Sequence, residues 1–147
     1  MTIEIKLLHP NARMPVKATD GSAGYDLTSA VSEDIYQGET LLINLGFAMS
    51  MPPDMCAFIC SRSGLAAKKS VFVLNAPGII DSDYAGEVKV VLTNLGDSPF
   101  RIRVGDRVAQ MVFHYVPATE MKEVTKLVHY GSARGEGGFG STGGTSE

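Results

Sequence analysis

Hydrophobic and polar residues alternate with a period of two over much of the chain. Ile3, Ile5 and Leu7 alternate with polar residues, and the same pattern returns in residues 88–93 and 100–104. A period of two sends successive side chains to opposite faces of a strand. Each of these runs therefore predicts a β-strand with one buried face.

Short clusters of turn-forming residues separate the apolar runs. They recur about every ten residues, which is the rhythm of an antiparallel sandwich or barrel. The clusters are residues 20–22, 37–38, 52–54, 76–78, 84–86, 96–99 and 105–106. One segment, residues 63–70, predicts a helix of about two turns. We therefore expect an all-β fold, a jelly-roll-like antiparallel β-sandwich with one short helix.

The composition is that of one ordinary globular domain. The chain has 147 residues, of which 44% are apolar and 20% charged, and this excludes a disordered chain. The net charge of −3 leaves no broad basic surface, so we expect no nucleic-acid partner. No signal-peptide pattern begins the chain, and no apolar run approaches the roughly 18 residues of a membrane span. We expect a cytoplasmic protein with no membrane partner.

The cysteines and histidines form no metal-binding pattern. Cys56 and Cys60 lie in one apolar run, and their spacing predicts two reduced core thiols. Of the three histidines, His114 is expected within a strand, and His9 and His129 at the surface.

Residues 131–147 break the strand pattern. They contain seven Gly, three Ser and two Thr, which is typical of a flexible C-terminal arm that follows a β domain of residues 1–130. Composition alone favours a disordered tail. Arg134 and Phe139, however, suit a segment that orders over an anionic, planar ligand, because arginine pairs with phosphate and phenylalanine offers a stacking face.

The segment between two apolar runs, residues 71–74 and 88–92, is a candidate binding hairpin. If the runs pair about a turn near Tyr84, Ile79 lies roughly opposite Lys89, and backbone groups near Gly78 stay unpaired. Such groups could recognise the edge of a flat ring. Asp81 and Asp83 are ordinary turn formers in the simpler interpretation, and the spaced acids of a calcium loop are missing.

Residues 61–66 and Gln110 are two further candidates. Arg62 and the residues after it stand at the start of the predicted helix, where unpaired N–H groups, a hydroxyl and a guanidinium make an anion site. The simpler alternative is a helix cap with a solvated arginine. Gln110 is a polar residue in a mostly apolar run, and a buried glutamine needs a hydrogen-bonding partner.

Five segments together resemble the five motifs of the homotrimeric deoxyuridine triphosphatase (dUTPase) family, in the family's order and at its usual spacings. They are residues 23–27, 61–66, 78–86, 105–110 and 134–143. The resemblance implies a jelly-roll homotrimer that hydrolyses dUTP to dUMP and pyrophosphate with Mg²⁺. Such an enzyme keeps uracil out of DNA and supplies dUMP for thymidylate synthesis. Each of the three sites is expected to draw on all three chains.

The resemblance also assigns roles to single residues. Asp81 is expected to be the general base that activates water, and Asp26 to support the metal through a water. Residues expected to bind the phosphates are Arg62, Ser63, Gly64, Gln110, Arg134, Ser141 and Thr142. Residues expected to bind uracil or deoxyribose are Asn75, Gly78, Ile79, Ile80, Tyr84, Lys89, Phe139 and Gly140. Tyr84 is expected to pack on the sugar, and residues 131–147 to close over the site of a neighbouring subunit.

Two other functions remain open on the sequence. A dCTP deaminase shares this fold, but it needs a Glu where this chain has Val91. A noncatalytic or regulatory trimeric binding module is the second alternative, against which the intact Asp81 argues.

Overall fold

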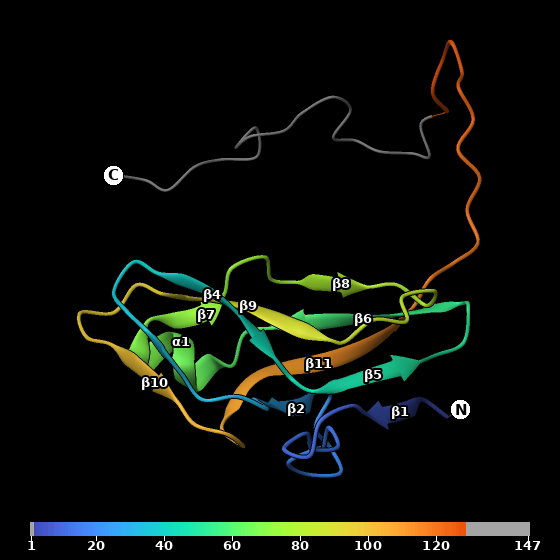
Figure 1. Ribbon diagram of the computed structural model, residues 1–147. Helices are drawn as coiled ribbons and strands as arrows, with labels where there is room; N and C mark the ends of the chain where they lie inside the picture. Colours follow the sequence, from blue (N-terminus) through green and yellow to red (C-terminus); the bar gives the residue numbers. More distant parts are fainter. Residues whose placement is uncertain (1, 129–147) are drawn as a thin grey trace, which may run out of the picture.

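The structure, a computed structural model, describes residues 2–128, which form eleven strands and one helix (Figure 1). All strand pairs are antiparallel, which confirms the all-β prediction. A four-stranded sheet has the order β2 (Tyr25–Thr28), β11 (Arg107–Tyr115), β6 (Met55–Cys60) and β8 (Gly78–Ile80). A three-stranded sheet has the order β4 (Thr40–Asn44), β9 (Lys89–Asn94) and β7 (Val71–Val73).

Two further pairs of strands complete the sandwich. β1 (Glu4–Leu7) pairs with β5 (Phe47–Ser50), and β3 (Glu33–Ile35) pairs with β10 (Phe100–Ile102). One hydrophobic core joins all four sheets, because it contains Leu27, Ile35, Phe47 and Leu92, each at most 1% exposed. Leu92 stands at an inward position of the alternating run 88–93, as the period of two predicts, and the other three come from β2, β3 and β5.

The helix α1 (Ser63–Lys69) lies where the sequence predicts it. It ends at Ser70, whose backbone takes the left-handed conformation with φ 53° and whose N–H bonds back to Ala66 O. Such an ending satisfies one of the last carbonyl groups of a helix. Because α1 follows β6 directly, it places its first turn at the end of the four-stranded sheet.

The predicted register of the segment between β7 and β9 is wrong. These strands do pair, but Val73 is opposite Leu92, and this register centres between residues 82 and 83 rather than at Tyr84. Ile79 is not opposite Lys89, because β8 leaves this ladder and pairs with β6, where Ile79 is opposite Phe58. Pro77 explains the break, since proline has no N–H to donate to a ladder.

The structure also describes both cysteines and two of the three histidines. Both cysteines are free thiols, Cys56 buried and Cys60 half-buried. His114 lies in β11 and stacks on Phe58 with 4.2 Å between ring centroids, and His9 is exposed. His129 lies outside the described residues. Within residues 2–128 there is no helix with the length and apolar character that a bilayer crossing requires.

Candidate functional site

Three of the five motif segments meet at one end of the four-stranded sheet. Gln110 in β11 is opposite Asp26 in β2 on one side and opposite Cys60 in β6 on the other. Ser61 and Arg62 follow Cys60 directly, so the strand pairing alone brings these side chains together. We call Asp26, Ser61, Arg62, Arg107 and Gln110 the Arg62 cluster.

Two arginines share the carboxylate of Asp26. Arg62 Nε donates to Asp26 Oδ1 at 3.2 Å, and Arg107 Nη1 donates to Asp26 Oδ2 at 3.0 Å. Arg62 Nη1 also donates to the carbonyl oxygen of Arg107 at 3.1 Å. The Arg62 guanidinium is therefore held at two points. Within the described residues no partner takes its other N–H groups, which leaves them for an anion.

The start of α1 adds backbone donors beside Arg62. Arg62 is the residue that precedes the helix, and its side chain makes no capping hydrogen bond. The side chain is 25% exposed and ion-paired, so the alternative of a helix cap with a solvated arginine does not describe it. Ser63 and Gly64 are exposed, and the first N–H groups of a helix have no partner within the helix. These donors and Arg62 form a surface suited to phosphate.

Gln110 has the partner that its position demands. Its Nε2 donates to the carbonyl oxygen of Ser61 at 2.9 Å, and Ser61 Oγ in turn accepts from the backbone N–H of Val73 at 2.9 Å. Gly24 makes room for this arrangement, because a Cβ at that position would lie 2.7 Å from Gln110 Oε1. Gln110 thus ties β11 to the loop that carries Arg62.

A second group of expected site residues lies on the segment around β8. Asn75, Ile79, Asp81 and Tyr84 are all exposed there. The Tyr84 hydroxyl donates to the carbonyl oxygen of Glu87 at 2.9 Å, which fixes the outer end of the ring. Three expected residues remain: Gly78 is buried and Ile80 half-buried in β8, and Lys89 is exposed at the start of β9, 3.8 Å (Nζ to Oε2) from Glu87.

Gly86 lies directly against the Tyr84 ring. A Cβ at Gly86 would lie 2.6 Å from the tyrosine hydroxyl oxygen, so no larger residue fits there without moving the ring. The hydrogen bond to Glu87 and the contact with Gly86 therefore both fix the position of the Tyr84 ring.

One chain does not bring the two groups together. Ile80 is opposite Ala57, so Asp81 comes level with Cys56, whereas Arg62 lies beyond the other end of β6. Arg62 stands six positions after Cys56, which at strand spacing is roughly 20 Å. No base at that distance reaches a phosphate held by Arg62.

No protein cage for a metal is present in the described part of the chain. Within it, no three His, Cys, Asp or Glu side chains are grouped to hold an ion. Asp26 brings a carboxylate to the Arg62 cluster, and both of its oxygens accept from arginine. Each carboxylate oxygen has a second lone pair, so Asp26 has room to accept a hydrogen bond from a metal-bound water.

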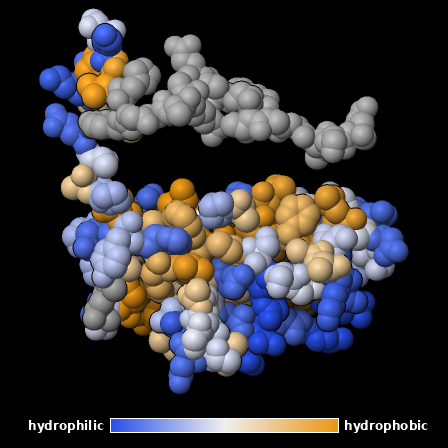
Figure 2. Space-filling model, turned by 180° about the vertical axis from the view of Figure 1, so that it is seen from behind, coloured by the Kyte–Doolittle hydropathy of each residue, from blue (hydrophilic) through white to orange (hydrophobic). Residues whose placement is uncertain are grey.

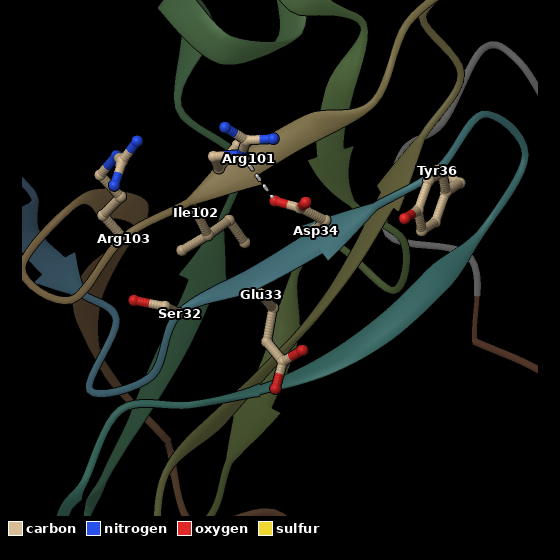
Figure 3. A pocket seen from close by; sticks show the side chains of 7 residues that line it. All are labelled: Ser32, Glu33, Asp34, Tyr36, Arg101, Ile102 and Arg103. Carbon is tan, nitrogen blue, oxygen red and sulfur yellow. Dashed lines mark hydrogen bonds and ion pairs between the residues drawn. The ribbon is translucent and has the colours of Figure 1, made fainter.

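A separate surface hollow of about 440 Å³ lies over β3 and β10 (Figure 3). Its lining includes Asp34 and Arg101, which form an ion pair of 3.1 Å between Oδ1 and Nε. The lining contains none of the residues expected to bind substrate, and its positive and negative side chains are balanced. It is not part of the candidate site.

Comparison with known proteins confirms the family that the motifs resemble. The family model "dUTPase" matches residues 10–143. The chain belongs to the dUTPase family. It is 43% identical to the deoxyuridine 5'-triphosphate nucleotidohydrolase of Helicobacter pylori, over 97% of both chains. The enzyme of the same name from Wolinella succinogenes is 45% identical, over 97% of this chain and 95% of its own length.

Solved dUTPase structures show the same fold. The dUTPase of Staphylococcus bacteriophage 80alpha, solved with dUPNHPP, superposes with a TM-score of 0.89 at 30% identity and covers 97% of this chain and 98% of its own. A dUTPase of phage phi11, in a structure that describes a structural Mg(II) ion, gives 0.81 at 25% identity over 86% of this chain and 99% of its own. The jelly-roll-like fold expected from the sequence is thereby confirmed.

The site residues expected from the dUTPase motifs fall into three sets. Asp26, Arg62 and Gln110 come together in the Arg62 cluster, with Ser63 and Gly64 beside it. Asp81, Asn75, Tyr84 and the residues of β8 lie on one segment, and Lys89 begins β9. Arg134, Phe139, Gly140, Ser141 and Thr142 lie outside the described residues. Arg107 is absent from the sequence-based expectations, because nothing in the linear pattern shows that it contacts Asp26.

Proposed function

We propose that this protein hydrolyses dUTP to dUMP and pyrophosphate in the presence of Mg²⁺, and so keeps uracil out of DNA and supplies dUMP for thymidylate synthesis. The observation that carries the proposal is the identity of 43% to a named deoxyuridine 5'-triphosphate nucleotidohydrolase along nearly the whole chain. The related phage dUTPase was solved with dUPNHPP, which supports a triphosphate ligand.

The Arg62 cluster binds the triphosphate in this proposal. The outer N–H groups of Arg62 pair with phosphate oxygens, and the backbone of Ser63 and Gly64 donates from the start of α1. Gln110 holds the carbonyl of Ser61 and so keeps this loop in place beside the phosphates. A Mg²⁺ bound with the nucleotide would neutralise phosphate charge, held by phosphate oxygens and waters, with Asp26 as a partner of one water.

Asp81 acts as the general base. It takes a proton from a water that attacks the α-phosphorus; the new P–O bond forms to that water as the bond to the bridging oxygen breaks and pyrophosphate leaves. Asp81 is exposed, so a water molecule can reach its carboxyl group. A positioned base of this kind contributes about 10²–10⁴-fold to the rate.

The edge of β8 recognises the nucleoside. β8 is the last strand of its sheet and pairs on one side with β6, so backbone groups on its other side have no ladder partner among the described residues. Such an edge, from Gly78 to Ile80, offers donors and acceptors to uracil. Asn75, Lys89 and backbone groups nearby complete the base site, and the Tyr84 ring packs on the deoxyribose and leaves no space for a 2′-hydroxyl.

The active site is shared between the chains of a homotrimer. The roughly 20 Å between Asp81 and Arg62 within one chain supports a site made of the Arg62 cluster of one chain and β8 of another. The third chain contributes residues 131–147, in which Arg134, Ser141 and Thr142 bind phosphates, and Phe139 and Gly140 cover the uracil.

Exposed apolar side chains supply surface for such contacts. Leu42 and Leu74 are 58% and 54% exposed on the three-stranded sheet, and Figure 2 shows apolar surface along the side where β4 and β8 lie in Figure 1. After β11, residues 116–128 leave the sandwich (Figure 1) and expose Met121 and Leu127. Burial against another copy would remove this apolar surface from water.

Pyrophosphate release from dUTP, UTP, dTTP and dCTP tests the proposed function. We expect release from dUTP, with the other three nucleotides hydrolysed far more slowly. Ammonia release from dCTP would instead indicate a deaminase, although Val91 offers no base. Binding of dUPNHPP without turnover of dUTP would indicate a noncatalytic binding module.

A further inference from the structure

Arg107 lies on the outer face of the four-stranded sheet, where simple alternation would not place it. Gln110 faces outward beside Asp26, so strict alternation would point residue 107 inward. Val108 and Ala109 are both buried, however, and the pairing of β11 with β2 shifts by one residue between Arg107 and Ala109. Such a β-bulge re-aims the side chains that precede it. Here it turns Arg107 toward the face that carries Asp26.

This placement lets Arg107 hold Arg62 by two routes. Its Nη1 donates to Asp26 Oδ2 at 3.0 Å, while Asp26 Oδ1 accepts from Arg62 Nε at 3.2 Å. Its own carbonyl oxygen accepts from Arg62 Nη1 at 3.1 Å. The Asp26 side chain is 14% exposed and the Arg107 side chain 54% exposed, so Arg107 closes the cluster from the solvent side.

We propose that Arg107 is a positioning residue, which fixes the plane of the Arg62 guanidinium against the triphosphate by holding Asp26. The inference rests on the proposed function, because it takes a nucleoside triphosphate as the ligand of Arg62. A guanidinium recognises phosphate through a flat fork of donors, so its orientation decides how many hydrogen bonds it makes. Without Arg107, one oxygen of Asp26 has no partner in the cluster, and the carboxylate is free to rotate away from Arg62 Nε.

The melting temperature distinguishes a purely structural role of Arg107 from the proposed positioning role. Arg107 is half-exposed and Asp26 keeps its bond to Arg62, so losing Arg107 should leave the melting temperature nearly unchanged. The ion pair of Arg101 with Asp34 provides a matched control, since it has a similar length of 3.1 Å and lies at the hollow shown in Figure 3. Breaking either pair should affect the fold equally, but only Arg107 should affect the ligand.

The test measures the dissociation constant of dUPNHPP with Mg²⁺ by calorimetry on the full-length protein. We expect Arg107→Met to weaken binding about tenfold, as loss of a residue that orients a binding group typically does. Arg107→Lys should retain most of the affinity, because it keeps a cation beside Asp26. Arg101→Met should bind like the wild type. The double variant Arg62→Met with Arg107→Met should bind no more weakly than Arg62→Met alone, since Arg107 acts through Arg62.

Three outcomes would overturn the inference. Unchanged binding by Arg107→Met, or a loss that adds fully to that of Arg62→Met, would show that Arg107 does not act through Arg62. A melting temperature of Arg107→Met far below that of Arg101→Met would show a structural role. In each case wild-type binding of dUPNHPP leaves the proposed function standing. A wild type that does not bind dUPNHPP would overturn both.

Discussion

At the scale of single residues, two glycines leave space for side chains of the candidate site. Gln110 reaches Ser61 because Gly24 has no side chain, and the Tyr84 ring lies beside Gly86 for the same reason. Both glycines stand in motif segments of the sequence, and the partner of Gly24 is distant along the chain, whereas Tyr84 is only two residues before Gly86. Each glycine serves to keep a neighbouring functional side chain in its place.

Gly24→Ala should lower activity without unfolding the protein. The new Cβ would lie 2.7 Å from Gln110 Oε1, and the flexible end of the glutamine would move, releasing the carbonyl of Ser61. A misplacement of about 1 Å can cost about 10²-fold, so we expect kcat/KM for dUTP to fall by roughly 10–100-fold. Gly21→Ala is the control, because nothing lies within 4 Å of its Cβ position. Equal kinetics for the two variants would contradict this role of Gly24.

At the scale of elements, the alternation of residues predicts the strands but not their partners. The runs at residues 3–7, 88–93 and 100–104 do form strands, and α1 forms at its predicted place. The pairing of β8 with β6 and the bulge before Ala109 depend on contacts between distant segments, which period-two patterns do not encode. For that reason the sequence indicates Gln110 and Arg62 as site residues but does not indicate Arg107.

Tyr84→Ala should admit UTP. Tyr84 lies on the segment between β8 and β9, where its hydroxyl bond to Glu87 and its contact with Gly86 fix the ring. Removing the ring removes the volume that excludes a 2′-hydroxyl, and pocket contacts of this size discriminate about 10–200-fold. The ratio of kcat/KM for dUTP to that for UTP should therefore shrink by roughly tenfold or more.

Tyr84→Phe separates the ring from its hydrogen bond. This variant keeps the ring and loses the bond to Glu87. Its ratio of kcat/KM for dUTP to that for UTP should therefore stay near that of the wild type. An unchanged ratio in Tyr84→Ala would refute the steric explanation.

At the scale of the whole molecule, the proposed site residues are distributed over the two ends of the four-stranded sheet and over residues 131–147. β11, the last strand in the described residues, ends at Tyr115, so deletion of residues 131–147 removes no described strand. In the proposed function each chain carries two partial sites, and activity belongs to the assembly.

Truncation after residue 130 should reduce kcat by about 10²-fold, because it removes Arg134, Phe139, Ser141 and Thr142, which are proposed to orient the triphosphate and exclude water. The melting temperature and the sedimentation of the trimer should stay near those of the full chain. Full activity after truncation would support the alternative of a disordered solubilising tail.

Complementation between two inactive chains tests the shared site most directly. Arg62→Ala and Asp81→Asn are each expected to lose most activity. If they are unfolded together, refolded in equal amounts and assayed with dUTP, a functional site forms where Arg62 comes from an Asp81→Asn chain and Asp81 from an Arg62→Ala chain. In random assembly, half of the sites receive an intact Arg62 and half receive an intact Asp81. Both are present at about a quarter of the sites, so we expect about a quarter of the wild-type specific activity.

The matched control mixes Arg62→Ala with Gln110→Ala, whose altered residues both lie in the Arg62 cluster of one chain. No chain in that mixture has an intact cluster, so its activity should not exceed the mean of the two variants alone. A gain of activity in the first mixture and none in the second would establish a site built from different chains. No gain in the first mixture, with trimers present, would contradict the shared site.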